Sequence, residues 1–172
     1  MSPPKRTIAI SGGARVTGIA VLDGAETIRR FELISLRGIL DPARRAARLR
    51  QAIGRIIANE APACVVIEAL AVPRDSNMNR DANHAIREVV SLYGLVPEAV
   101  PLDEARRFIG SGKKISRADL HRLLALKFRH LASCTRQVAG PSRFSDLDAY
   151  WERAFAALAL AIVTYAPSTA AS

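Results

Sequence analysis

Apolar and polar residues alternate along the first 36 residues of the chain, in short runs separated by turn-forming residues. A period of two is typical of β-strands, whose side chains point alternately to opposite faces. Gly12 and Gly13 favour a reversal of the chain between the first two runs. The pattern therefore predicts a meander of three strands, at residues 7–11, 17–22 and 27–36.

Two more strands are predicted farther along the chain. Residues 63–67 are apolar at nearly every position, which is typical of a central strand that is covered on both faces. This run ends in the charged residue Glu68. Residues 99–102 form a short fifth strand.

Helices are predicted where apolar residues recur every three or four positions. Asp41 is a favourable N-cap and Pro42 a favourable first residue for a helix that runs to residue 59. Ser116 and Asp119 resemble a capping box that opens a helix over residues 120–130. Other helices are expected at residues 79–95, at 103–108 and up to about residue 165, with a loop at 132–146 and a disordered tail at 167–172.

This order of elements, a meander followed by strands that alternate with helices, predicts an α/β fold. The expected architecture is a mixed five-stranded sheet with helices on both faces. A chain of 172 residues can bury one sizeable core. Residues 1–166 are therefore predicted to form a single domain.

Charge narrows the classes of partner. The chain has 25 Lys and Arg against 16 Asp and Glu, a net charge of +9, and its isoelectric point is about 10.5. Such a balance favours nucleic acid as the partner, although acidic membranes and acidic proteins also fit it. Several arginines of the helix at residues 42–59 lie off its apolar stripe, and a solvated helix face explains them better than DNA contact.

No segment is expected to enter a membrane. The apolar run at residues 154–165 is shorter than the ~20 residues that cross a bilayer, and the first ten residues lack the long apolar stretch of a secretory signal. Cys64 and Cys134 offer neither a disulfide framework nor the spacing of a metal site. A cytoplasmic location is therefore expected.

Several short segments carry a family pattern when they are taken in chain order. They are residues 10–22 with the stretch Arg15-Val16-Thr17-Gly18, then Val66-Ile67-Glu68, Ala105-Arg106-Arg107, residues 109–114 and residues 157–162. Each match is weak alone, but together they span roughly residues 7–163 in consistent order. The chain resembles the RuvC-type Holliday-junction resolvases.

The resemblance implies an RNase H-like fold and the metal-dependent cutting of four-way DNA junctions, typically by a homodimer. In that chemistry two divalent cations, Mg²⁺ or Mn²⁺, lie ~4 Å apart and are held by acidic side chains. Branched or duplex DNA is then the expected partner. No nucleotide is expected, because Arg107 and Lys114 stand where a Walker loop needs Gly and Ser or Thr.

The acidic positions of the family pattern are only partly kept. Ser11 stands at the first metal-binding position, and its neutral hydroxyl offers neither the charge nor the bridging geometry of a carboxylate. Glu68 matches the second position. The predicted catalytic set is the degenerate Ser11 with Glu68, Asp148, Glu152 and Lys114, and the predicted metal ligands are Glu68, Asp146, Asp148 and Glu152.

The acids before the last helix allow two interpretations. When residues 157–162 are laid on the family's closing helix, the expected acids fall near Arg153 and Ala156. Only a shift of about one helical turn brings Asp148 and Glu152 into those places. In the second interpretation these acids lie at the start of a helix because the helix dipole favours them there. Both interpretations stay open.

A basic loop follows the third predicted helix. Lys114, with Lys113 beside it, resembles the family's loop lysine, which contacts the scissile phosphate or helps to neutralise the transition state. A solvated loop that binds phosphate without catalysis is the alternative. Arg15 and Arg117 complete the predicted DNA-binding set.

Two functions are consistent with these residues. In the first, the chain is a RuvC-like junction endonuclease homologue that binds branched DNA and cuts it poorly, because Ser11 replaces the first acid. In the second, it is a non-cutting descendant that binds DNA, or that offers only a protein-binding platform on the same fold.

Overall fold

The computed structural model describes residues 5–70, 76–134 and 146–165, and for residues 146–149 it describes the backbone alone. Within this part of the chain a mixed five-stranded sheet has the order β3-β2-β1-β4-β5. The strands are β1 (Arg6–Ser11), β2 (Val16–Asp23), β3 (Thr27–Ser35), β4 (Cys64–Glu68) and β5 (Glu98–Val100). The predicted α/β class and the mixed sheet are confirmed.

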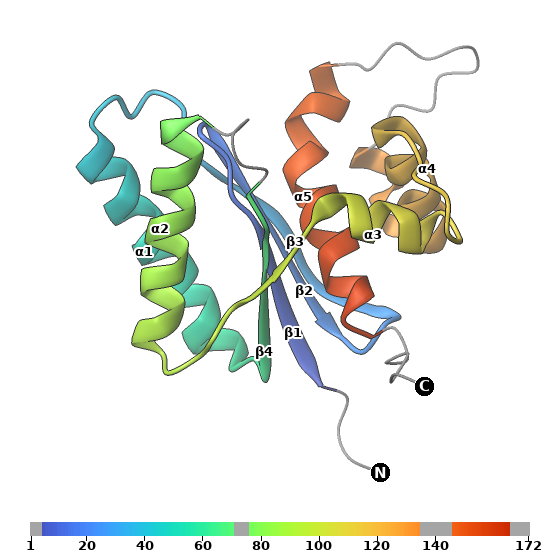
Figure 1. Cartoon of the computed structure of the whole chain (residues 1–172), viewed down its shortest axis with the longest axis horizontal. Helices are drawn as coiled ribbons and strands as arrows, with labels where there is room; N and C mark the ends of the chain where they lie inside the picture. The colour runs from blue at the N-terminus through green and yellow to red at the C-terminus, as the bar shows by residue number, and fades with distance from the viewer. Residues whose placement is uncertain (1–4, 71–75, 135–145, 166–172) are drawn as a thin grey trace.

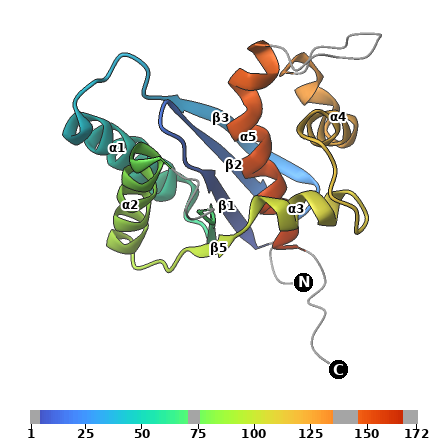
Figure 2. The same ribbon diagram turned by 45° about the horizontal axis from the view of Figure 1, so that its top comes forward.

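Helices cover both faces of this sheet, as the sequence predicts. They are α1 (Pro42–Glu60), α2 (Asn77–Leu92), α3 (Leu102–Ile109), α4 (Arg117–Lys127) and α5 (Asp146–Val163). The helices α1 and α2 lie on one face, and α3, α4 and α5 lie on the other (Figures 1 and 2). The molecule therefore has three layers, with β1 in the middle of the central one.

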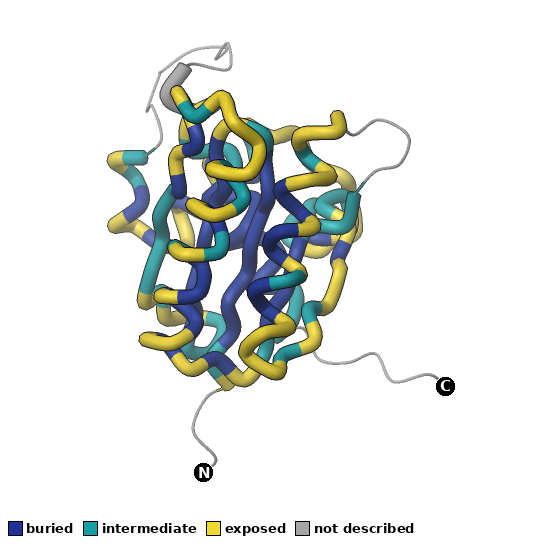
Figure 3. Tube along the Cα trace, turned by 90° about the vertical axis from the view of Figure 1, so that its left-hand side faces the viewer, coloured by how far each residue is buried: buried dark blue, intermediate teal, exposed yellow. Residues whose placement is uncertain are grey.

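The two faces of β1 belong to two different cores. Ile8 and Ile10 pack with α1 and α2, whereas Ala9 packs with α5. Residues 154–162 of α5 are all buried, which accounts for the apolar run in the sequence. The central strands form a continuous buried band in Figure 3.

Among the described helices, none combines the length and the apolar character needed to cross a bilayer.

Most observed boundaries differ from the predicted ones by one to three residues, and two of the differences have a clear physical reason. The helix α4 ends at Lys127, and a 3-10 helix, η1 (Arg129–Cys134), takes up the start of the predicted loop. Leu131 of η1 is buried, so apolar packing organises this segment. The helix α2 begins two residues earlier than predicted, because the hydroxyl of Ser76 accepts a hydrogen bond from the Asn79 backbone N–H at 3.2 Å and caps it.

An ion-pair network closes the end of the sheet where β1 begins. Arg6 donates from Nε and Nη2 to the two carboxylate oxygens of Asp23, at 2.6 and 3.1 Å. Glu60, at the end of α1, accepts from Arg29 at 3.1 Å and from Arg30 at 3.3 Å. The hydrogen bond from Arg6 holds the pKa of the Asp23 carboxyl below its usual value. This basal network, formed by these five residues, ties three strands to α1.

Candidate functional site

The opposite end of β1 carries a second polar cluster. β1 and β4 run parallel, with Ile10 paired to Ile67, so the next residues, Ser11 and Glu68, lie side by side where the strands end. Ser11 is fully buried, and its hydroxyl donates a hydrogen bond to Glu68 Oε2 at 2.5 Å. The crevice outside the carboxyl ends of parallel strands is where open α/β sheets commonly bind ligands.

Arg153 of α5 completes this cluster. Its Nη1 donates to Glu68 Oε2 at 2.9 Å and to the Ser11 hydroxyl oxygen at 3.3 Å. The Glu68 carboxylate is therefore paired with a positive charge and also accepts from a hydroxyl. Ser11, Glu68 and Arg153 together form what we call the strand-end cluster.

Two glycines allow α5 to approach so closely. A Cβ on Gly18 would lie 2.0 Å from the backbone carbonyl of Arg153, so the helix backbone rests directly on β2. Gly18 also pairs with Ser11 across the β1–β2 ladder. A Cβ on Gly13 would lie 2.9 Å from Arg153 Nε, so the bare turn leaves room for the guanidinium. The glycines of this hairpin thus bring a helix residue to the strand ends.

The other acidic candidates are not seen to join this cluster. Glu152 pairs with Arg117 of α4, Oε1 to Nη1 at 2.9 Å. Asp146 and Asp148 belong to the first turn of α5, but their side chains fall outside the described residues. Where side chains are described, no three groups among His, Cys, Asp and Glu come together as metal ligands would. A metal pair does not fit a cluster whose one carboxylate is already held by a guanidinium.

The predicted lysine loop lies between α3 and α4. Lys114 Nζ contacts Asp103 Oδ2 at 2.6 Å, and this hydrogen bond holds the pKa of the Asp103 carboxyl below its usual value. Arg106 donates to the backbone carbonyl of Ile115 and so fastens the loop to α3. Lys113 is exposed. The loop therefore presents one lysine that is paired and one that has no acidic partner among the described residues.

The remaining predicted DNA-binding residues, Arg15 and Arg117, lie in the first hairpin and at the start of α4. Arg15 is exposed in the β1–β2 turn, two residues after Gly13. Arg117 begins α4 and reaches α5 through its pair with Glu152, the neighbour of Arg153. Of these two residues, the structure thus shows Arg117 in contact with α5, whereas Arg15 is an exposed residue of the hairpin.

Arg153 is the functional candidate that the sequence did not bring into the predicted site. The signal was present, because the family pattern put an expected acid near Arg153. The sequence interpretation concerned only the nearby acids Asp148 and Glu152 and gave Arg153 no role. Its contact with Glu68 shows that the position faces the strand ends although its charge is opposite.

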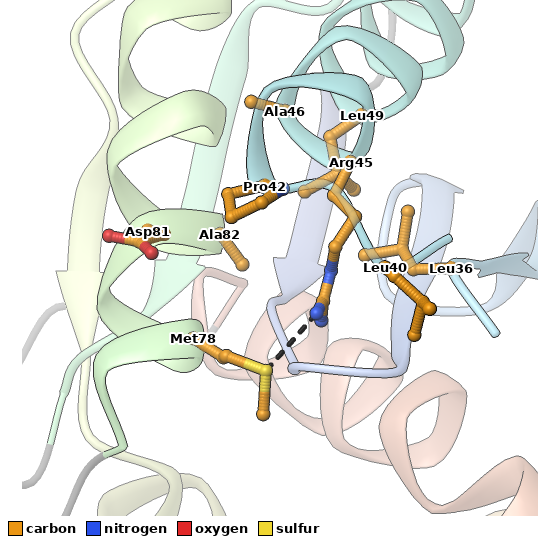
Figure 4. Close-up of a pocket in the computed structure, with 9 residues that line it drawn as sticks. All are labelled: Leu36, Leu40, Pro42, Arg45, Ala46, Leu49, Met78, Asp81 and Ala82. Carbon is orange, nitrogen blue, oxygen red and sulfur yellow. Dashed lines mark hydrogen bonds between the residues drawn. The ribbon is translucent and has the colours of Figure 1, made fainter. Parts of the chain in front are cut away.

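A separate hollow lies between the starts of α1 and α2, and Figure 4 shows its lining. Its volume is about 100 Å³, and Arg45 Nη1 contacts Met78 Sδ across it at 3.1 Å. The lining residues are Leu36, Leu40, Pro42, Arg45, Ala46, Leu49, Met78, Asp81 and Ala82. None of the strand-end residues lines this hollow.

Comparisons with known proteins give fold-level information. No protein-family model matches the sequence, and a search of curated proteins finds no match. Solved structures do match. The RuvC structure from Thermus thermophilus has a TM-score of 0.66 and 14% identity over 91% of each chain.

Two further structures agree with this result. T. thermophilus RuvC in complex with a Holliday junction substrate has a TM-score of 0.64 and 14% identity, over 91% of this chain and 90% of that one. The yeast mitochondrial Holliday junction resolvase Ydc2 has a TM-score of 0.54 and 11% identity, over 95% and 84%. The resemblance predicted from the sequence is thus confirmed for the fold, which is of the RuvC type.

Proposed function

We propose that this chain binds branched DNA on a RuvC-type fold and does not cut it through a metal-dependent nuclease centre. The observation that carries the proposal is the strand-end cluster, in which Ser11, Glu68 and Arg153 hydrogen-bond to one another. Junction binding is supported by the fold match to a RuvC bound to a Holliday junction substrate and by the net charge of +9.

The charges of the cluster argue against a metal pair. Glu68 contributes one negative charge, and Arg153 Nη1 lies 2.9 Å from it. At an effective dielectric constant of ~20, two unit charges ~4 Å apart interact by about 4 kcal/mol, and a divalent ion doubles that figure. A cation beside Glu68 would therefore be repelled by the guanidinium as strongly as the carboxylate attracts it.

Two exposed basic groups suit a phosphate backbone. Lys113 and Arg15 are exposed, and neither has an acidic partner among the described residues. Phosphate contacts of this kind release counterions, so log affinity should fall steeply with log salt. A flat salt dependence would favour the alternative, a protein partner. That two copies pair on the junction stays a prediction, and the mass of the protein–DNA complex measures it.

Binding and cutting of a synthetic four-way junction, measured on the same protein sample with Mg²⁺, test the proposal. We expect the junction to be bound more tightly than a linear duplex of equal length, with no cleavage. Cleavage by the unmodified protein that stops with EDTA and in Glu68→Gln would overturn the non-cutting part. Equal, weak binding to junction and duplex would overturn the branched-DNA part.

Ser11→Asp sharpens this test. It restores a carboxylate at the first acidic position, but Arg153 stays within reach of Glu68, so we expect no gain of cutting. Mg²⁺-dependent nicking by Ser11→Asp alone would show that the missing acid is the sole defect and that Arg153 is no obstacle.

A further inference from the structure

The guanidinium of Arg153 bonds to the described side chains through only one of its nitrogens. Arginine has five N–H donors, and those of Nε and Nη2 form a fork that matches carboxylate and phosphate. At Arg6 this fork is occupied, because Nε and Nη2 hold the two carboxylate oxygens of Asp23. Arg153 bonds Glu68 and Ser11 through Nη1 alone. Its Nε and Nη2 have no acceptor among the side chains that the structure describes.

The surroundings hold this fork in place. Glu68 is itself fixed by the Ser11 hydroxyl, and it anchors Nη1 on the side of the strand ends. The guanidinium also packs against Gly13, where a Cβ would lie only 2.9 Å from Nε. The Arg153 side chain is 31% exposed, so water and ligands reach it without unfolding. An arginine that is anchored on one side and open on the other loses little freedom on binding.

From this geometry, and resting on the proposed binding of DNA, we propose that Arg153 binds a backbone phosphate through its Nε and Nη2 and needs no divalent cation. A permanent cation of the protein thus stands where the resemblance implied metal ions. Glu68 is a positioning residue in this site, because it orients the guanidinium and does not touch the phosphate. Arg117, which pairs with Glu152 next to Arg153, is the neighbouring basic residue that the structure shows.

Junction binding in EDTA and in Mg²⁺ at equal ionic strength is the first test. We expect the unmodified protein to bind no more weakly in EDTA. Arg153→Ala should lower affinity about tenfold or more in both buffers, since a hydrogen-bonded charge is lost, and should reduce the salt slope by about one. Arg153→Lys keeps the charge without the fork and should fall between the two. Trp151, the single tryptophan of the chain, reports folding of each variant by its fluorescence.

Arg122→Ala is the matched control. Arg122 lies on α4 and pairs with Asp119 at 2.7 Å, so its loss removes the same charge away from the strand ends. The control should bind nearly as the unmodified protein does. Equal effects of Arg153→Ala and Arg122→Ala would overturn the phosphate site while leaving DNA binding intact. No junction binding by the unmodified protein would instead overturn the proposed function itself.

A charge-reversed variant gives the second test. Ser11→Asp with Arg153→Asp puts two added carboxylates beside Glu68 and removes the built-in cation. Binding in EDTA should then be weaker than in Arg153→Ala, and Mg²⁺ should restore part of it. The readout is affinity, so no cutting is required. If the double variant binds as tightly as the unmodified protein in EDTA, no phosphate lies near Arg153 and the inference fails.

Discussion

The two ends of β1 carry arginine–carboxylate clusters that differ in how completely their charges are paired. In the basal network three arginines share the carboxylates of Asp23 and Glu60. In the strand-end cluster a single arginine, Arg153, meets Glu68 through one nitrogen. The first arrangement joins β1, β2, β3 and α1, whereas the second leaves donors toward the crevice outside the strand ends.

This difference teaches that similar side chains take their role from their place in the sheet. Carboxyl ends of parallel strands open into a crevice, where a partly paired charge can meet a ligand. Such a cluster adds less to stability than the basal network, since its one ion pair is partly exposed and joins a single arginine to a single carboxylate. At the basal end Glu60 is almost fully buried, so each arginine that it loses leaves its charge less fully compensated away from water. The basal network should therefore govern stability, and the strand-end cluster should govern binding.

The largest effect is expected from Gly18→Ala, because it disturbs the packing of α5 on β2 and so displaces Arg153 from the strand-end cluster. The new Cβ would lie 2.0 Å from the Arg153 carbonyl, which is backbone and has no rotamer to change. The helix α5 must then move off β2, at a cost of about 3 kcal/mol or more. Urea unfolding measures the loss, and junction binding should fall with it.

Gly54→Ala is the control for this substitution. Its Cβ would meet the hydroxyl of Tyr93 at 3.2 Å, the end of a side chain that can move, inside helix α1. A helix interior favours Ala over Gly, so stability should be unchanged or higher. Equal losses in both variants would mean that the contact of Gly18 with α5 is not a special constraint.

A smaller effect on stability is expected when the carboxylates of Glu60 and Glu68 are neutralised one at a time. Glu60→Gln removes the charge that Arg29 and Arg30 share, and should lower the free energy of unfolding by roughly 2–3 kcal/mol. Glu68→Gln leaves one arginine that water can hydrate, so about 1 kcal/mol or less is expected. Denaturant unfolding of both variants measures the two losses. A larger loss for Glu68→Gln would reverse the comparison.

Much of this architecture could be predicted because it follows local patterns. The alternation of β1 and β2, the apolar run of β4 and the cap at Asp41 each depend on neighbours in sequence. That Ser11 and Glu68 each end a strand also follows from the sequence, whereas their side-by-side placement depends on the parallel pairing of β1 with β4. The start of η1 could not be predicted, because the burial of Leu131 depends on how α4 and α5 pack.

The candidate site was harder to predict, for a physical reason. Arg153 and Glu68 are 85 residues apart in the sequence. They meet because Gly18 and Gly13 have no side chains at the places where α5 packs against the hairpin. The periodicity of apolar and polar residues predicts helices and strands, but it does not predict how closely a helix packs on a strand. The resemblance did mark the position of Arg153, but its charge was opposite to the one expected. An arginine at a position where the resemblance implies an acid was therefore the sequence feature that pointed to this site.

The smallest predicted effect is a difference in acid sensitivity. Arg6 holds the pKa of Asp23 below its usual value, so folding favours the ionised carboxylate. Its contribution to stability is complete above the ordinary carboxyl range near ~3.9 and is lost as pH falls through the lowered pKa. Stability of the unmodified protein should therefore drop below about pH 4, and Asp23→Asn should flatten that drop.

Asp103, which belongs to neither cluster and pairs with Lys114 in the lysine loop, provides a reference for this test. Its pKa is also lowered, by Lys114, but its side chain is 47% exposed against 19% for Asp23. Solvent screens an exposed pair, so Asp103→Asn should change the acid profile less than Asp23→Asn, and added salt should reduce that change further. Thermal unfolding between neutral and acid pH measures both variants. An Asp103→Asn effect equal to that of Asp23→Asn would mean that stability does not depend chiefly on the basal end.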